Sequence, residues 1–469
     1  MKNIFVWGLL YYLRFFARLT LFLHKPKVIG ITGSVGKSST RNALHAMMKD
    51  YFKVKVIKEG NSETGIPLGV LGLNPGNYRL PDWLKAMFLA PFKLNSLKDI
   101  QYLIIEMGID SPHPPKNMDY LLTIVKPDIA VVLNVYLVHT MQFDEIVDEN
   151  LIGEKRIKTI LEKIVEEKMK IITKAEPKVS IYNVDDKNIR RYTSSEQNES
   201  RSSRQARTLN FGESEEADIK FLNYQVNLKR TSFRYLLKKE NKEIEINIQN
   251  FVLPKRYLEV FAATIAVGKS IGLTNKKIVD GLSKNFTIPT GRGSIFEGIN
   301  SSIIVDSSYN ASKASVLTFL EMTKELSEKE NRPFILLLGD MRELGQETKM
   351  EHEAVAKKIA DLKVDQVYCV GPNTKKYVIP KIKKDPSTRT SSSLGMTGGA
   401  RWFRTAVEAG DYLRKTLPYR AIVLVKGSQN EIFLEEAVKK ILKNKSDSKK
   451  LCRQNDFWVK KKRAFFQGV

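Results

Sequence analysis

The sequence predicts an α/β protein with two sheets of mainly parallel strands, each covered by helices. Apolar runs such as "KVIGIT", "YLIIEM" and "DIAVVLNV" alternate with helix-like stretches from residue 28 onward. Strands covered by helices on both faces have this composition. A second series, "SSIIVD", "PFILLLGD", "DQVYCVG" and "AIVLVKGS", follows "TIPTGRGS" at 287–294. We therefore expect a central domain over 28–287 and a smaller, Rossmann-like α/β domain over 288–443.

Composition narrows the class of protein. With 469 residues, 42% of them hydrophobic, the chain is long enough for two or three domain cores. A formal net charge of +25 favours anionic partners such as nucleotides, nucleic acid or acidic lipid. The only two cysteines exclude a disulfide framework and a four-thiolate zinc site within one chain, and they favour a reducing, cytoplasmic compartment. Polar stretches at 193–218 and 387–400 are expected to be surface loops, and 444–469 a basic tail.

Residues 1–27 are predicted to form an amphipathic helix. The stretch "IFVWGLLYYLRFFARLTLFL" has the length of a membrane span, but it contains Arg14 and Arg18. A central arginine costs about 2.5 to 3.5 kcal/mol on insertion, so spanning is disfavoured. Two alternatives remain, because the same helix could lie on an anionic membrane surface through residues 1–24 or pack on the body of the protein.

The segment "VIGITGSVGKSST" at 28–40 has the organisation of a phosphate-binding loop. A buried strand ends at Thr32, glycines follow, and a helix opens where its positive end attracts phosphate. Lys37 would reach the β- and γ-phosphates of ATP, and the Ser38 hydroxyl would bind Mg²⁺. The alternative is a plain glycine turn between strand and helix. The central domain is thus expected to be a P-loop-type mononucleotide-binding domain with this nucleotide-binding set: Gly33, Ser34, Gly36, Lys37, Ser38 and Ser39.

The spacing G-x-x-G-x-x-G-K-S differs from the strict G-x-x-x-x-G-K-[ST] form and resembles the Mur ligase superfamily, in particular its MurF branch. The resemblance implies an ATP- and Mg²⁺-dependent amide ligase that joins D-Ala-D-Ala to a UDP-MurNAc-tripeptide through an acyl phosphate. It implies a cytoplasmic, monomeric enzyme with small-molecule substrates and no nucleic-acid partner. The stretches that carry it are "GNSETGIPLGVLGL" (60–73), "IIEMG" (104–108), "NVYLVHTMQF" (134–143), "IYNVDD" (181–186), "VDSSYNAS" (305–312), "LLGDMRELG" (337–345), "VLVKGS" (423–428) and "CRQNDFW" (452–458).

The resemblance also implies the catalytic residues of the central domain. Glu106 and Ser38 would hold one Mg²⁺, and His139 a second. Members of the family carry a lysine carbamylated by CO₂ that helps to hold the second ion. In "NLIGEKRIKTIL" the candidate is Lys155, with Lys158 as the alternative, and a solvated helix face is the simpler explanation for either.

Residues outside the loop are implied as further contacts. Arg292 and Asn310 would contact ATP, and the remaining candidates would meet the acceptor or the incoming amino substrate. Because strand-end Asp and Ser side chains often cap helices, a purely structural role is the alternative for some of them. These substrate candidates are Asn61, Asp340, Lys426 and Ser428.

Two departures from the family pattern leave other functions open. The stretch "PKRYLEVFAAT" (254–264) differs where relatives contact adenine, and only 27 residues precede the first strand, where relatives carry a UDP-binding domain. The acceptor is therefore expected to be held differently or not to be UDP-linked. A folylpolyglutamate-synthase-like ligase is disfavoured by "GNSETGIPLG", and a lipid-linked amidation ligase by the cysteine count. A non-catalytic, membrane-attached nucleotide-binding scaffold would differ by showing no ATP turnover.

Overall fold

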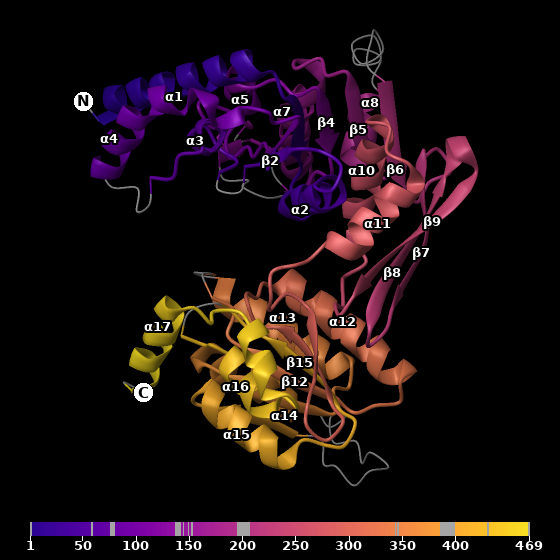
Figure 1. The fold of residues 1–469 in the computed structure, drawn as a ribbon. Helices are drawn as coiled ribbons and strands as arrows, with labels where there is room; N and C mark the ends of the chain where they lie inside the picture. The colour runs from indigo at the N-terminus through magenta and orange to yellow at the C-terminus, as the bar shows by residue number, and fades with distance from the viewer. Residues whose placement is uncertain are drawn as a thin grey trace. The chain divides into compact units, whose positions relative to one another are not determined.

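The computed structural model divides the chain into two compact units (Figure 1). The first comprises Met1–Tyr224, Phe233–Asn247 and Arg256–Thr287, and the second comprises Gln225–Ser232, Ile248–Lys255 and Ile288–Val469. Both are α/β, as the sequence predicts. The structure describes residues 2–57, 60–75, 80–136, 142–143, 145–148, 150–151, 153–194, 207–342, 344, 347–384, 399–428 and 431–467.

The first unit is built on a nine-stranded sheet of order β2-β3-β1-β4-β5-β6-β7-β8-β9. Its centre is β1 (Lys27–Thr32), which pairs in parallel with β3 (Tyr102–Glu106) and β4 (Ile129–Val132). β2 (Val54–Val56) and β5 (Val179–Asn183) extend the parallel part on either side. The carboxyl ends of β1, β3 and β4 therefore lie at one edge, which is where sheets of this kind bind ligands.

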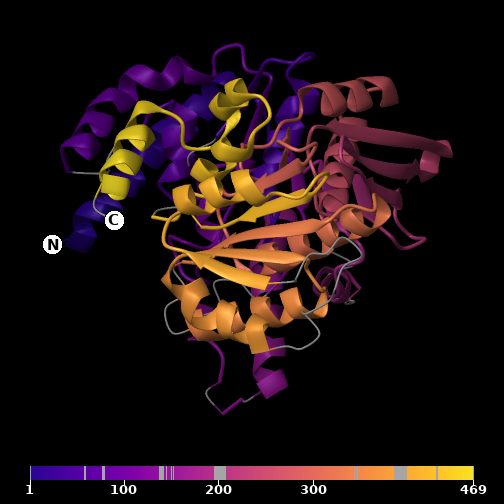
Figure 2. The ribbon, with the colours of Figure 1, turned by 90° about the horizontal axis from the view of Figure 1, so that it is seen from below.

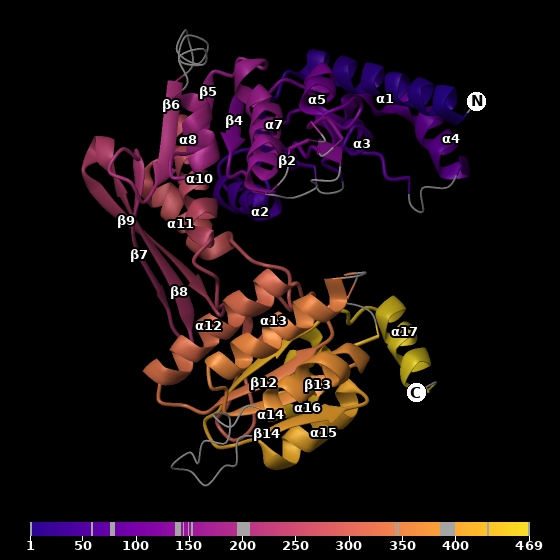
Figure 3. The same cartoon turned by 180° about the vertical axis from the view of Figure 1, so that it is seen from behind.

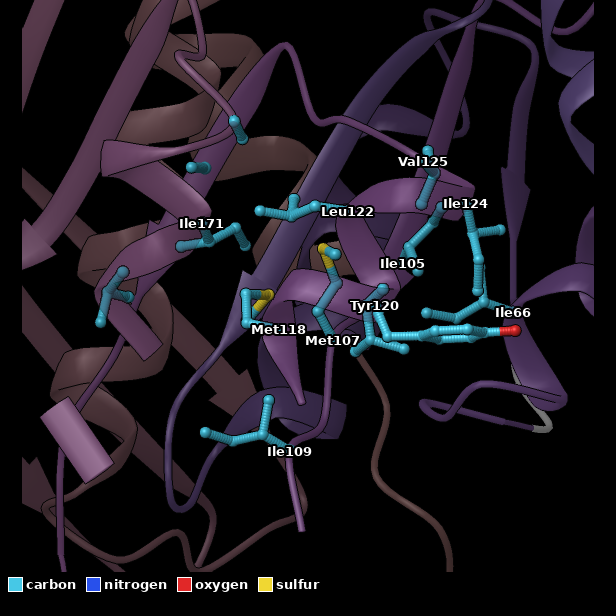
Figure 4. Packing of buried hydrophobic residues seen from close by; sticks show 14 of the residues in the cluster. Ile66, Ile105, Met107, Ile109, Met118, Tyr120, Leu122, Ile124, Val125 and Ile171 are labelled. Carbon is cyan, nitrogen blue, oxygen red and sulfur yellow. The ribbon is translucent and has the colours of Figure 1, made fainter. Parts of the chain in front are cut away.

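Helices cover both faces of this sheet because successive side chains of a strand point to opposite faces. Val28, Leu103 and Val132 share one cluster with residues of α5 (Met118–Ile124) and α7 (Gly153–Thr173). Figure 4 shows part of this cluster from close by, with Met118 and Ile171 among the labelled residues. The intervening residues of the same strands point to the other face. There α2 (Lys37–Met48), α10 (Tyr257–Ser270) and α11 (Asn275–Asn285) pack together.

A ribbon of three strands at the end of this sheet was not predicted. β7 (Ile219–Val226), β8 (Arg230–Leu237) and β9 (Lys242–Gln249) are joined by connections too short for a parallel crossover. β6 (Arg207–Gly212) runs through the stretch 193–218 that was expected to be a loop, so that expectation is wrong for this segment. β9 has the burial pattern of a half-exposed strand, whose polar residues resemble those of a loop in the sequence.

The second unit has a six-stranded sheet of order β10-β11-β15-β12-β13-β14. The four predicted strands are present as β11, β12, β13 and β15, all parallel to their neighbours within this group. Helices α12 (Lys313–Lys329) and α13 (Thr348–Asp361) lie on one side of the sheet, and α15 (Ala406–Thr416) and α16 (Glu435–Ile441) on the other (Figures 2 and 3). The strands are β10 (Ser294–Glu297), β11 (Ile303–Ser307), β12 (Phe334–Gly339), β13 (Gln366–Val370), β14 (Gly399–Phe403) and β15 (Ile422–Lys426).

The N-terminal helix α1 (Lys2–His24) packs on the first unit. It contacts α3 (Gly65–Leu71) and η1 (Ala90–Leu97), and the Tyr12 hydroxyl donates to Met87 O of α4 (Leu80–Leu89) at 3.1 Å. Its inner face is buried: Leu9, Leu10, Leu13, Ala17 and Thr20.

One of the two arginines of α1 is part of this packing. Arg14 donates to Thr123 Oγ1 at 2.9 Å, and its guanidinium lies 4.5 Å from the centre of the Tyr11 ring. Within the described residues, the segment Val6–His24 has the length and apolar composition of a membrane span.

The segment expected to be a basic tail contributes buried residues to the second unit. After η6 (Lys445–Lys450), the Arg453 guanidinium makes a two-pronged ion pair with Glu435 at 2.9 and 2.7 Å, and both side chains are buried. Arg453 also donates to the carbonyls of Ser308 and Tyr309. Lys462, on α17 (Asp456–Gln467), pairs with Glu435 at 3.4 Å.

Candidate active site

The phosphate loop joins β1 to α2 at the carboxyl edge of the first sheet. Gly36 is the N-terminal capping residue of α2, and its φ of 91° lies in the left-handed region that favours glycine. Gly33 approaches the neighbouring strand end so closely that a β-carbon there would lie 3.0 Å from Leu133 Cβ. The glycines therefore allow a tight turn that leaves the first N–H groups of α2 free of intrahelical partners.

The Lys37 ammonium folds over this loop. It donates to Gly33 O at 2.6 Å and to Ser34 O at 3.4 Å. Burial lowers the pKa of Lys37, and the carboxylates of Glu106 and Asp110 act in the opposite direction. The cation thus lies at the loop that the sequence predicts to hold nucleotide phosphates.

Glu106 and Ser38, the two residues expected to share a metal ion, lie side by side. Ser38 Oγ donates to Glu106 Oε2 at 3.0 Å, and Glu106 is 5% exposed at the end of β3. A hydroxyl and a carboxylate are oxygen donors of the kind that Mg²⁺ prefers. In the described part of the chain, no group of three or more His, Cys, Asp or Glu residues is arranged to hold a metal.

Arg41 is a site residue that sequence analysis missed. Its Nη1 lies 2.6 Å from Glu106 Oε1 and 3.3 Å from Ile57 O. Arg41 follows Lys37 by four residues on α2, so that helix periodicity places it on the same face. The four-residue spacing from Lys37 is the feature of the sequence that could have identified Arg41 as a site residue.

Asn134, after β4, is a second residue that was missed. Its Oδ1 accepts from Val35 N at 2.9 Å, and its Nδ2 donates to Val35 O at 3.2 Å and to Glu259 Oε2 at 2.9 Å. Burial raises the pKa of Glu259, and the hydrogen bond from Asn134 opposes that shift. Asn134 therefore connects the phosphate loop to α10, where the Tyr257 hydroxyl also meets Ser39 Oγ at 3.4 Å.

Asn61 lies at the end of β3, close to Glu106. Gly108 N donates to Asn61 O at 2.8 Å, and a β-carbon on Gly108 would lie 2.7 Å from Asn61 Nδ2. The segment 60–65 is thereby held against the strand end that carries Glu106.

The lysines of α7 differ sharply in their surroundings. Lys155 and Lys158 are exposed, and Lys158 pairs with Glu162 at 3.9 Å. Lys168, in contrast, is only 3% exposed. Burial lowers the pKa of Lys168 to about 7, the positive charge of Lys37 adds to this effect, and Asp110 opposes it. His139 lies outside the described residues.

Lys168 could have been found from the spacing of apolar residues in α7. It lies four residues after Ile164 and four before Ile172, and both isoleucines are buried. These three positions share one helix face. A lysine on the buried face of a helix is uncommon unless it is paired or functional.

In the second unit, Arg292 and Asn310 are both exposed at the carboxyl end of β11. The Arg292 guanidinium lies 4.8 Å from the centre of the Tyr309 ring. Asn310 Oδ1 accepts from Ala311 N at 2.8 Å. Both candidate ATP contacts therefore adjoin Tyr309: Arg292 lies close to its ring, and Asn310 follows it in the chain.

The other candidates of the second unit are buried in loop contacts. Asp340 is 2% exposed and accepts from Asn373 N at 2.9 Å and Thr374 N at 2.8 Å. Lys426 is 1% exposed and donates to the carbonyls of Ser307 and Asn310.

Ser428 joins two loops of the same unit. Its Oγ donates to Ala311 O at 3.3 Å and accepts from Arg342 N at 3.1 Å. It is 2% exposed. Lys426 and Ser428 thus hold the loop that presents Asn310.

Two family models match most of the chain. The Mur ligase middle domain matches residues 31–251, and the Mur ligase, glutamate ligase domain matches residues 291–429. The N-terminal residues before position 31 fall outside both matches.

Curated relatives and a solved structure agree with these matches. The UDP-N-acetylmuramoyl-tripeptide–D-alanyl-D-alanine ligase of Rickettsia prowazekii is 26% identical over 410 residues, which cover 86% of this chain and 76% of the relative. The ligase of the same name from Bacillus subtilis is 25% identical over 349 residues, and the match covers 74% of this chain and 63% of the relative.

The fold is similar to that of MurF ligase from Thermotoga maritima, whose structure is a complex with ADP. The TM-score is 0.62 at 22% sequence identity, and the match covers 92% of this chain and 83% of the other. With both domain models matched in order along one chain, and with a glycine loop, Lys37 and Glu106 at the carboxyl edge of a parallel sheet, the chain belongs to the Mur ligase family.

Proposed function

We propose that the protein is an ATP-dependent amide ligase of peptidoglycan precursor synthesis, which adds D-Ala-D-Ala to a UDP-MurNAc-tripeptide. The observation that carries the proposal is the grouping of Lys37, Ser38 and Glu106 around the loop between β1 and α2. The names of the Rickettsia and Bacillus relatives supply the substrates. The enzyme would work in the cytoplasm as a monomer, with ATP and Mg²⁺ and without a nucleic-acid partner.

The residues of the loop would bind and activate ATP. Free N–H groups at the start of α2 and the Lys37 ammonium would hold the β- and γ-phosphates. Ser38 Oγ and Glu106 would hold a Mg²⁺ ion, which neutralises phosphate charge when bound. Arg41 keeps the Glu106 carboxylate oriented toward Ser38.

The chemistry would proceed in two displacements. A carboxylate oxygen of the tripeptide forms a bond to the γ-phosphorus while the bridging oxygen leaves with ADP. The amine of D-Ala-D-Ala then forms the C–N bond, loses a proton, and displaces inorganic phosphate. No protein nucleophile is needed, so the protein contributes mainly positioning and electrostatic stabilisation.

Lys168 is our candidate for the carbamylated lysine, in place of Lys155 or Lys158. Its amine would form an N–C bond with CO₂ and release one proton, and this reaction requires the neutral amine. A pKa near 7, caused by burial, leaves much of that amine neutral at physiological pH. Lys168 also lies within electrostatic reach of Lys37, whereas Lys155 is exposed.

The remaining candidates divide into contacts and positioning residues. We assign ATP contact to Arg292 and Asn310, and substrate contact to Asn61 beside Glu106. Asp340, Lys426 and Ser428 would act through the loops that they hold. Residues 1–24 would add a peripheral contact with the inner face of the membrane, because Tyr11, Phe15 and Phe22 stay exposed.

A coupled assay tests the function. Purified protein with ATP, Mg²⁺, UDP-MurNAc-tripeptide and D-Ala-D-Ala should release phosphate and form the UDP-pentapeptide, and omission of either substrate should stop both. Product from a lipid-linked tripeptide alone would favour the alternative acceptor. Nucleotide binding without phosphate release from any pair would indicate a scaffold and contradict the proposal.

Asn134→Ala is expected to raise the KM for ATP about tenfold. The substitution removes two hydrogen bonds to Val35, each worth about 1 kcal/mol, and the phosphate loop would have to be ordered by the nucleotide itself. Steady-state kinetics with varied ATP measure the effect. The matched control is Asn285→Ala. The Asn285 side-chain amide donates a hydrogen bond to Ala46 O, near the other end of α2, at 3.1 Å. Equal KM values for the two variants would show that Asn134 does not shape the site.

A further inference from the structure

The outer face of α1 carries an uninterrupted exposed stripe. Gly8, Tyr11, Phe15, Arg18 and Phe22 follow one another at alternating spacings of three and four, which places them on one helix face. Tyr11 is 51% exposed, Phe15 61% and Phe22 69%. Because the opposite face of α1 is packed, the rings of Phe15 and Phe22 are not needed to attach the helix to the protein. A continuous row of exposed aromatic side chains marks an interaction surface.

A second apolar row lies on the neighbouring elements α4 and η1. Leu84 is 52% exposed, Phe88 71% and Phe92 72%, and the rings of Phe88 and Phe92 are 5.7 Å apart. α4 is attached to α1 by the hydrogen bond from the Tyr12 hydroxyl to Met87 O. Figure 1 shows α4 beside the N-terminal part of α1. Two exposed lysines, Lys85 and Lys93, flank this row. The apolar exposure of this part of the first unit is thus shared by α1, α4 and η1 and is accompanied by positive charge.

A cavity of about 670 Å³ opens beside the end of the α1 stripe. Its floor is apolar and includes the buried side chains of Val28, Leu122 and Ile124. Arg18 and Phe22 of the stripe contribute to its wall. The cavity therefore combines an apolar floor with a polar rim.

The charges at the rim leave an excess of cations. Asp119 pairs with Lys170 at 2.7 Å and with Lys174 at 2.6 Å, and Asp128 pairs with Lys178 at 3.5 Å. In the part of the chain that the structure describes, no carboxylate forms an ion pair with Arg18 or with Lys126, the other cation of the rim. Two positive side chains thus face an apolar recess without a described acidic partner.

We propose that this face docks on an anionic lipid bilayer and that the cavity takes the head group of an anionic phospholipid. The phosphate would lie near Arg18 and Lys126, and the adjoining apolar part of the lipid would lie on the cavity floor. Tyr11, Phe15 and Phe22 would enter the interfacial layer, where aromatic side chains are favoured. The inference rests on the proposed peripheral contact of residues 1–24 and not on the ligase reaction.

The position of the cavity in the sheet is compatible with catalysis. Val28 begins the buried part of β1 and Asp128 immediately precedes β4, so the cavity lies at the amino edge of the sheet. Lys37 and Glu106 lie at the carboxyl edge. A bilayer on the cavity side would leave the phosphate loop open to solvent.

Co-sedimentation of the full chain with vesicles tests the proposal. We expect binding to mixed phosphatidylglycerol and phosphatidylcholine vesicles, weaker binding as salt is added, and little binding to phosphatidylcholine alone. Phe15→Ser with Phe22→Ser should weaken binding at least tenfold because two exposed apolar rings are removed. Arg18→Gln with Lys126→Gln should cost about fivefold per cation and reduce the salt dependence.

Matched control variants separate loss of docking from the effect of removing any exposed aromatic ring or lysine. Tyr419 is 70% exposed in the second unit and Lys415 is exposed on α15, so Tyr419→Ser and Lys415→Gln should bind vesicles like the original chain. All variants change exposed side chains and should keep the original melting temperature.

Three outcomes would overturn the proposal. These are equal binding to neutral vesicles, unchanged binding after loss of Phe15 and Phe22, and a stable dimer in solution that these substitutions dissociate without any vesicle binding. The last would assign the stripe to a second copy of the chain. Phosphate release in the ligase assay, measured without vesicles, reports separately on the proposed function.

Discussion

Lys168→Met is expected to abolish ligase turnover and, in the same protein, to raise the free energy of unfolding at neutral pH. Turnover should fall at least 10²-fold, since a carbamate can no longer form within electrostatic reach of Lys37. Stability should rise because methionine fills a similar volume without the cost of burying an amine that the solvent would protonate. Loss of activity together with gained stability would be hard to explain by misfolding.

The lowered pKa of Lys168 also predicts how the free energy of unfolding changes with pH. The unfolded chain keeps the Lys168 proton up to a pH near 10.5, whereas burial lowers the pKa in the folded chain to about 7. Between these values the unfolded state binds more protons, so the free energy of unfolding should rise with pH across this window. Below pH 7 both states are protonated and the cost of burial is fully present. Denaturant unfolding of the original chain should show this rise, and Lys168→Met should lack its contribution.

Carbamylation itself has a separate readout. Removing CO₂ should lower the activity of the original chain, and bicarbonate should restore it. In Lys168→Ala, bicarbonate should have no effect, while a small carboxylic acid in solution should restore part of the turnover by replacing the carbamate. Lys155→Ala and Lys158→Ala are the matched controls on α7 and should stay active. Loss of activity in Lys155→Ala but not in Lys168→Ala would return the role to Lys155.

Lys37→Ala is expected to lower phosphate release by about 10²- to 10³-fold, which is the usual effect of removing one charge contact to a transition state. The loop would keep its glycines and the N-terminus of α2, so nucleotide binding should weaken much less than turnover. Single-turnover phosphate release and equilibrium ADP binding separate the two effects. Lys49→Ala is the control, because Lys49 is the exposed C-terminal capping residue of the same helix. Turnover close to that of the original chain would contradict the assignment of the loop.

The features that could be predicted from the sequence are those that depend on residues adjacent in the chain. The phosphate loop follows from adjacent residues, and β11, β12, β13 and β15 follow from unbroken apolar runs. The ribbon β7 to β9 was missed because half-exposed strands alternate polar and apolar residues, as loops can.

Residues whose role depends on distant partners could not be found in this way. The charge of Lys37 acts on Lys168 only because α7 packs against the sheet, and 131 positions separate the two residues. Asn134 acquires its role from Val35 and Glu259, which lie in two other segments. The α7 lysines illustrate the point, since the sequence suggested Lys155 and Lys158, which are exposed, and only burial distinguishes Lys168 from them.

The ion pair between Arg453 and Glu435 has a consequence for how the chain is made. Glu435 is wholly buried, and its partners are 18 and 27 residues further along the chain. Synthesis proceeds from the N-terminus. When α16 has just been synthesised, the Glu435 carboxylate is therefore present before Arg453 and Lys462, the cations that neutralise it. The backbone carbonyls of Ser308 and Tyr309 also lack their hydrogen-bond donor until Arg453 has been synthesised. The second unit can therefore complete its fold only after Arg453 has been synthesised, and a premature stop before Arg453 would leave it incomplete.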